Sequence, residues 1–230
     1  MPAERTADDY SECVPEPGCV GARVRSGPAH WQHGAMAGRA PAPELPIHEA
    51  ATVGDWERWL EEQHAASPGV WLMIAKRGSD ATSVSYPEAL ETALCFGWID
   101  GQKRGRDEHH WLQRFTPRGA RSRWSQINRE AAEALIAAGR MQPAGLRQIE
   151  AARSDGRWAA AYPPQSTATV PDDLQRALDE NPAARAFFMT LTGSPRYAFL
   201  YRLHSVRSPV GRRERIAGYI KRLSQGRTLD

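Results

Sequence analysis

A stretch in the middle of the chain, from Leu94 to Asn128, combines residue types that core packing alone does not require. It holds three of the eight tryptophans, a Gly-Trp-Ile-Asp-Gly core and seven lysine or arginine residues. Arginine can bind a carboxylate or phosphate through two parallel hydrogen bonds, and tryptophan rings stack on planar groups. The stretch therefore predicts a concave surface that binds something anionic, polar or flat.

The residues of this stretch that we expect to contact a ligand are aromatic, cationic or polar. They are Trp98, Asp100, Arg114, Thr116, Arg118 and Trp124, with Arg123 considered beside them. Arg114 and Arg118 would anchor an anion, the two tryptophans would wall the pocket, and Asp100 would orient an arginine or act as an acid or base. The alternative is that the tryptophans are core, Asp100 fixes a turn and the arginines are solvated, because buried aromatic residues usually serve packing.

Motifs for catalysis or metal binding are absent from the sequence, which has no G-x-S-x-G elbow, H-E-x-x-H pair, Walker loop or G-x-G-x-x-G turn. His109 and His110 are adjacent, and neighbours on a strand point to opposite faces, so the pair cannot easily bind one metal ion. We expect a surface turn there instead. Four candidate zinc ligands near the N-terminus miss zinc-finger spacing at every interval. They are Cys13, Cys19, His30 and His33. We assign no catalytic residue, metal or cofactor.

Basic residues are also concentrated near the C-terminus, where residues 196–230 hold nine of them against Glu214 and Asp230. Such a surface is typical of contacts with nucleic acid or an anionic membrane. The same residues would also form the solvent-exposed face of a helix whose apolar stripe includes Ile216, Tyr219 and Leu223. We expect the solvated face and keep nucleic-acid binding as an alternative.

The length of 230 residues, with 41% hydrophobic and 25% charged residues, is ordinary for a soluble globular protein. No apolar run approaches the roughly 18–20 residues of a membrane span, and no secretory signal is visible at the N-terminus. Three cysteines are an odd number in a chain too large to need disulfides, so we expect a cytoplasmic location and a buried Cys95.

The chain divides into three parts by composition. Residues 1–43 are rich in proline, glycine and alanine, which predicts a disordered extension, and translation could naturally begin at Met36. Residues 44–152 are expected to form an α+β core domain. Residues 153–230 are expected to form a helical C-terminal domain.

Periodicity predicts the elements of the core domain. Residues 53–64 place Trp56 and Leu60 on one helical face, and residues 70–75 are a short apolar run typical of a buried strand. Ser85 and Glu88 form a capping box that starts a helix ending before Gly97. Residues 98–103 and 110–115 predict a hairpin.

Proline and serine positions punctuate the rest of the chain into helices. Ser125 is a predicted N-cap, and Pro143 opens the next helix. Four more helices are expected to begin at Pro171, Pro182, Pro195 and Pro209, the last three after the caps Asn181, Ser194 and Ser208. The predicted class is α+β, with a small antiparallel sheet of two or three strands packed with helices, followed by a helical region.

Several short segments of residues 44–226 resemble the bacterial YdeI/OmpD-associated family, often labelled bacteriocin-protection proteins. The segments are Ala93–Gln102, Arg114–Arg118, Ser122–Arg129, Gly139–Met141, Asp155–Trp158, and Asn181–Ala184 through Arg196-Tyr197. The resemblance implies an association with stress or envelope resistance and brings no established catalytic residues. Residues 1–43 have no counterpart in the family pattern.

The sequence therefore predicts a soluble, stress- or resistance-associated binding protein. Its pocket in the Trp98–Trp124 region would hold a small anionic or aromatic ligand, or a protein partner. One alternative is a nucleic-acid-binding protein that uses the basic C-terminal helix. Another is an enzyme using the same cleft, which would show a perturbed Asp100 or a nucleophile there.

Overall fold

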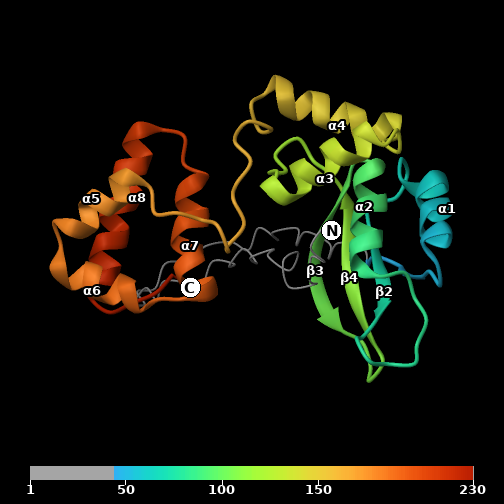
Figure 1. Ribbon diagram of the computed structural model, residues 1–230, viewed down its shortest axis with the longest axis horizontal. Coiled ribbons are helices and arrows are strands. Elements are labelled where there is room, and N and C mark those ends of the chain that lie inside the picture. The colour runs from blue at the N-terminus through green and yellow to red at the C-terminus, as the bar shows by residue number, and fades with distance from the viewer. Residues whose placement is uncertain (1–43, 230) are drawn as a thin grey trace, which may run out of the picture.

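The computed structural model describes residues 44–229, which contain four strands and eight helices (Figure 1). Their buried apolar side chains form two clusters, one drawn from residues 50–161 and one from residues 174–223. We call residues 44–162 the sheet unit and residues 167–229 the helical unit. The predicted extension, the start at Met36 and the four candidate zinc ligands lie outside the described residues.

The sheet has four strands in the order β1-β2-β4-β3. Their bounds are β1 Ile47–Glu49, β2 Val70–Ala75, β3 Trp98–Gly105 and β4 His110–Pro117. β1 pairs with β2 in parallel, whereas β2–β4 and β3–β4 are antiparallel. The α+β class is confirmed, but the prediction of two or three antiparallel strands is wrong. β1 was missed because three residues are too few to show alternation.

Four helices belong to the sheet unit, namely α1 Val53–Gln63, α2 Tyr86–Cys95, α3 Gln126–Ala137 and α4 Pro143–Ser154. The predicted caps of α2 and α3 are confirmed. The hydroxyl oxygen of Ser85 accepts a hydrogen bond from the Glu88 amide, and that of Ser125 accepts one from the Asn128 amide. These bonds satisfy amides that have no partner within the helix.

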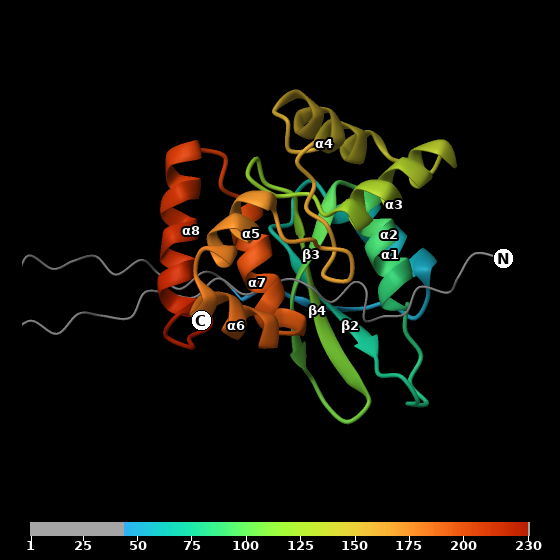
Figure 2. The same cartoon turned by 60° about the vertical axis from the view of Figure 1, so that its left-hand side comes forward.

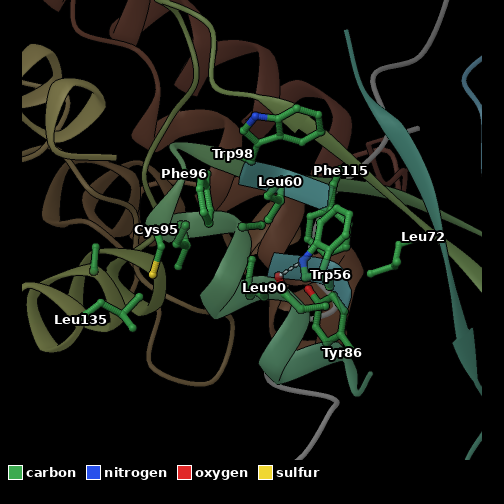
Figure 3. Close-up of a cluster of buried hydrophobic side chains, with 14 of the residues drawn as sticks. Trp56, Leu60, Leu72, Tyr86, Leu90, Cys95, Phe96, Trp98, Phe115 and Leu135 are labelled. Atoms are coloured by element: carbon green, nitrogen blue, oxygen red, sulfur yellow. Dashed lines mark hydrogen bonds between the residues drawn. The ribbon is translucent and has the colours of Figure 1, made fainter. Parts of the chain in front are cut away.

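Helices α1 and α2 cover one face of the sheet, and the core of the sheet unit lies between them and the strands (Figure 3). Trp56, Trp98 and Phe115 are among its largest fully buried side chains. The indole N–H of Trp56 donates to the carbonyl of Ala89, 3.0 Å away, which ties α1 to α2. Burial of such rings stabilises the fold by roughly 1.5–3 kcal/mol per side chain.

Helix α4 passes very close to the end of α2, and Gly145 makes this approach possible. A side chain at Gly145 would place its Cβ 2.4 Å from the carbonyl oxygen of Cys95 and 2.9 Å from that of Leu94. Cys95 itself is buried, as the sequence predicted. Burial raises the pKa of its thiol to about 11, so the thiolate is not populated at neutral pH.

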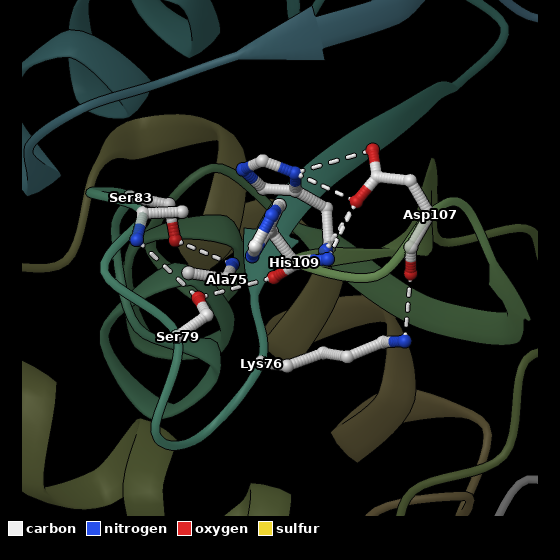
Figure 4. A network of polar contacts seen from close by, with 8 residues as sticks. Ala75, Lys76, Ser79, Ser83, Asp107 and His109 are labelled. Atoms are coloured by element: carbon white, nitrogen blue, oxygen red, sulfur yellow. Dashed lines mark hydrogen bonds and ion pairs between the residues drawn. The ribbon is translucent and has the colours of Figure 1, made fainter.

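Polar contacts close the far end of the sheet, where the loop after β2 meets the β3–β4 turn (Figure 4). Lys76 donates to the carbonyl oxygen of Asp107 over 2.7 Å, and the hydroxyl of Ser79 donates to that of His109. The Asp107 carboxylate accepts from the amides of His109 and His110. The surface turn expected at His109–His110 is therefore the turn of this hairpin.

The helical unit consists of α5 Asp172–Asp179, α6 Pro182–Thr190, α7 Gly193–His204 and α8 Pro209–Leu223. The predicted starts at Pro182 and Pro209 are confirmed, and Pro171 is the N-cap of α5, one residue before its first turn. The start of α7 is wrong by two residues, because its N-cap is Thr192 and Pro195 is its third residue. Proline is tolerated throughout a first turn, since those amides lack helical partners.

Helix α7 of the helical unit contacts the sheet unit. The ring of Tyr201 on α7 meets the edge of the Tyr162 ring, with centroids 4.9 Å apart, and Tyr197 donates to the carbonyl of Pro163. Both views show α7 closest to the sheet (Figures 1 and 2). No helix among residues 44–229 is long and apolar enough to cross a membrane.

Candidate functional site

Two of the predicted ligand contacts, Trp98 and Asp100, lie in the core beneath the helices. Trp98 is 1% exposed, and its indole donates to the carbonyl of His64. Asp100 is 9% exposed and accepts a hydrogen bond of 2.8 Å from the Tyr86 hydroxyl. Burial raises the pKa of Asp100, while the Tyr86 hydroxyl and the charge of Arg118 oppose the rise.

Arg114 and Thr116 project from the opposite face of the sheet. Asp100 is paired with Phe115, whose ring lies in the core under the helices. Successive residues of a strand point to opposite faces, so Arg114 and Thr116 point away from that core. Both are partly buried. The structure therefore does not bring these two residues together with Trp98 and Asp100.

Arg118 and Trp124 form a third group, in the loop between β4 and α3. The guanidinium carbon of Arg118 lies 3.6 Å from the centroid of the Trp124 ring, which is a close cation–π contact. One Arg118 nitrogen, Nη1, donates to the carbonyl of Arg123 over 3.1 Å. Arg118 is 3% exposed and Trp124 2% exposed. Their positions stabilise the loop from within.

A cleft lies beside this loop, at the junction of the sheet unit and the helical unit, with a volume of about 330 Å³. Its lining is dominated by cationic side chains from three separate segments. The lining residues are Ala120, Arg121, Arg123, Trp124, Asp155, Arg157, Ala160, His204, Ser205 and Arg207. We call it the arginine cleft. Of the six predicted ligand contacts, Trp124 is the one in its lining.

Arg157 is held firmly at the wall of the arginine cleft. Its Nε donates to the Asp155 carboxylate over 2.7 Å, and its Nη1 donates to the carbonyl of Ser122 over 3.0 Å. The Arg157 side chain is 10% exposed. These bonds leave Nη2 as the nitrogen that can donate to a ligand. The Arg157 backbone amide, which donates to the Asp155 carboxylate, and the Arg157 side chain together hold the pKa of Asp155 below its ordinary value, so this carboxylate stays charged.

Arg123 is positioned by aromatic rings from both units. Its guanidinium carbon lies 4.1 Å from the centroid of Tyr201 and 4.8 Å from that of Tyr162. Its Nη2 lies 3.5 Å from Nδ1 of His204. Partial burial, together with the charges of Arg123 and Arg212, lowers the pKa of His204, so the imidazole is neutral at neutral pH. A neutral imidazole nitrogen can accept from Arg123.

The arginine cleft is an anion-binding arrangement by its chemistry. Four arginines stand against one carboxylate, and guanidinium forks match the oxygens of carboxylate and phosphate groups. Among residues 44–229 no group of three or more His, Cys, Asp or Glu side chains is placed to hold a metal ion. The cleft therefore offers binding of a negative group rather than a metal centre.

Two residues of this cleft were already indicated by the sequence. Arg123 was considered among the candidate residues, and Arg157 lies in the Asp155–Trp158 group that carried the family resemblance. Arg121, His204 and Arg207 carried no signal of their own. They join the cleft only because the two units meet, and a contact between segments about eighty residues apart has no periodicity to reveal it.

Two family models match separate parts of the chain. Residues 48–148 match a model described as Domain of unknown function (DUF8412). Residues 167–226 match the model described as Bacteriocin-protection, YdeI or OmpD-Associated. The family resemblance is confirmed. It rests on the helical unit, whereas the motifs of residues 93–129 fall within the other model.

The two segments matched by these family models lie on opposite sides of the arginine cleft. Arg121 and Arg123 lie within the matched residues 48–148, while His204 and Arg207 lie within residues 167–226. Asp155 and Arg157 lie in the segment between the two matches. A search of curated proteins and a search of solved structures found no match.

Proposed function

We propose that this protein binds a small anionic ligand in the arginine cleft. The observation that carries the proposal is the lining itself, in which four guanidinium groups share one cavity of about 330 Å³ with a single carboxylate. That volume lies at the lower end of the roughly 300–1,000 Å³ of small-molecule sites. The proposed anion anchors are Arg123 and Arg157, in place of Arg114 and Arg118.

The burial of the other predicted contacts supports this choice of site. Arg118 is nearly fully buried against Trp124, and Trp98 is enclosed in the core. Neither can reach a ligand without a change in the fold. Asp100 has the raised pKa that an enzyme could use, but it lies outside the lining of the arginine cleft. Binding is therefore the function that this geometry favours over catalysis.

The wider role that we propose is cytoplasmic and concerns resistance to stress or bacteriocins. Support for it comes from the match of residues 167–226 to the bacteriocin-protection family. A buried thiol at Cys95 agrees with a reducing compartment. Such a protein could sense a small anion and pass the signal to a protein partner. The division into two domains is also part of the proposal, and the two separate cores support it.

Isothermal titration calorimetry at low ionic strength tests the function. We expect sulfate and phosphate to bind the full chain, and Arg157→Gln to weaken binding about tenfold, because one charge-assisted hydrogen bond contributes roughly 1.5–3 kcal/mol. The matched control is Arg147→Gln, an exposed arginine on α4 outside the cleft. Equal affinities for the wild type and Arg157→Gln, or weakening by Arg147→Gln, would contradict the proposed site.

A further inference from the structure

The charges in the arginine cleft also narrow the class of ligand. Four guanidinium groups face one carboxylate, Asp155, which is already paired with Arg157. A carboxylate ligand brings one negative charge, whereas a phosphoryl group brings about 1.5–2 negative charges and three acceptor oxygens at neutral pH. We propose, building on the anion-binding function above, that the ligand is a small phosphate ester whose phosphoryl group bridges the sheet unit and the helical unit.

Two donors for the phosphoryl group are positioned before the ligand arrives. Arg157 is fixed by Asp155 and by the Ser122 carbonyl, which leaves its Nη2 for the ligand. Arg123 is fixed by the ring faces of Tyr162 and Tyr201. A guanidinium that is already held in place loses little side-chain entropy on binding. Tetrahedral phosphoryl oxygens can accept from two such donors at once.

The helical unit contributes a further cation from the other side of the junction. Arg207 lies in the loop that follows α7, next to the neutral His204 at the end of that helix, so both belong to the helical unit. Arg207 is close enough to lower the pKa of Asp155 in the sheet unit, although four other effects contribute more. A phosphoryl group that reaches both Arg157 and Arg207 therefore crosses the junction and joins the two units.

The two hydrophobic cores are separate. Contacts that join the units around α7 include the Tyr162–Tyr201 ring pair, and Tyr197 donates to the carbonyl of Pro163, just after the sheet unit. Cations face one another across this junction, Arg121, Arg123 and Arg157 on one side and Arg207 on the other. Their repulsion is weaker when a dianion lies between them. Ligand binding consequently stabilises the arrangement of the two units.

The shape of the arginine cleft favours a small soluble ester as the source of the phosphoryl group. Both units wall the cleft, and its uncharged lining residues include Ala120, Ala160 and Trp124. A volume of about 330 Å³ accommodates a short organic chain beside the phosphoryl group. A lipid headgroup or a nucleic-acid backbone carries the same chemistry, so the test includes both sources.

The test combines calorimetry with hydrogen–deuterium exchange on the full chain under identical conditions. The probes are glycerol 3-phosphate and glycerate, which differ in carrying a phosphoryl or a carboxylate group on three carbons. Vesicles containing phosphatidic acid and a 5′-phosphorylated oligonucleotide represent the other two sources. The variants are Arg207→Gln and, as a control in the helical unit, Arg185→Gln, whose side chain is 58% exposed.

We expect glycerol 3-phosphate to bind at least about tenfold more tightly than glycerate. Arg207→Gln should weaken the binding of glycerol 3-phosphate about tenfold. Amides of residues 119–124 and 155–160 should be protected together with those of 204–208. Protection of the sheet unit alone would overturn the bridge and leave anion binding intact. Equal binding of both probes, or preferential binding of the vesicles or the oligonucleotide, would overturn the ligand class. Failure of every anion to bind would overturn the proposed function as well.

Discussion

The guanidinium carbon of Arg118 lies over the Trp124 ring, 3.6 Å from its centroid, and both side chains are buried. The same guanidinium donates to the carbonyl of Arg123, and its charge acts on Asp100 in the core. Arg118 therefore connects the core of the sheet unit to the loop that carries Arg123. Through that loop it positions an arginine of the cleft without reaching the cleft itself.

Arg118→Ala should lower the free energy of unfolding by about 3–5 kcal/mol, because it removes a buried cation whose charge favours the ionised form of Asp100. Arg118→Lys keeps the charge but loses the planar contact with Trp124, so its loss should be smaller, about 1–2 kcal/mol. Urea denaturation followed by circular dichroism measures both. Similar stability of Arg118→Ala and the wild type would show that this contact does not support the fold.

Gly145→Ala should destabilise the sheet unit by about 1–3 kcal/mol, the usual effect of overpacking. Its methyl group would collide with the backbone carbonyls of Cys95 and Leu94, so α4 would have to move. Gly218→Ala in α8 is the matched control, since a Cβ there meets nothing within 4 Å. The control should raise stability by roughly 0.5–1 kcal/mol. Equal effects of the two substitutions would contradict the close packing of α2 and α4.

Asp100→Asn should change the pH dependence of stability. The raised pKa means that the folded protein keeps a proton on Asp100 at pH values where the unfolded chain has lost it. Proton binding at Asp100 therefore stabilises the folded state at low pH. This stabilisation is lost as the pH rises from the ordinary pKa of a carboxyl group through the raised pKa of Asp100 in the folded protein. Urea melts across this range should show that loss for the wild type relative to Asp100→Asn. A difference that stays constant with pH would contradict the raised pKa.

The basic C-terminal helix should not act as a nucleic-acid-binding surface. Arg212 is already bound to the Asp173 carboxylate and to the carbonyl of Leu203, so it is engaged within the helical unit. Ile216, Tyr219 and Leu223 are buried on the other side of α8. Gel-shift assays at low and physiological salt should show at most weak, salt-sensitive binding. Tight binding that Arg213→Gln and Lys221→Gln abolish would favour nucleic acid instead.

Local patterns in the sequence were sufficient to predict most of the elements. The Ser85 and Ser125 caps and the apolar run of β2 depend on neighbouring residues, and each formed as expected. β1 was missed because its three residues become a strand only by pairing with β2. Thr192 was missed as a cap because its side chain makes no capping hydrogen bond, so little distinguishes it from Ser194.

The candidate site was harder to predict. Residue type does not show whether a side chain is buried, or which surfaces of the two units contact each other. Trp98 and Arg118 have the chemistry of ligand contacts, yet packing encloses both. Arg157 and Arg207 are ordinary arginines in the sequence and become neighbours in one cavity only when α7 meets the sheet unit. That junction depends on the rings of Tyr162 and Tyr201, which the sequence separates by 39 positions.

Anion binding between the two units is tested most directly by locating a bound dianion by crystallography. Crystals of the full chain soaked in selenate would show the anion by its anomalous scattering, independently of any assumption about the ligand. We expect a bound selenate whose selenium peak lies close to Arg123 and Arg157, with its oxygens within hydrogen-bonding distance of both and of Arg207 from the helical unit. Well-occupied selenate elsewhere, for example along α8, with no peak in the arginine cleft, would contradict this expectation.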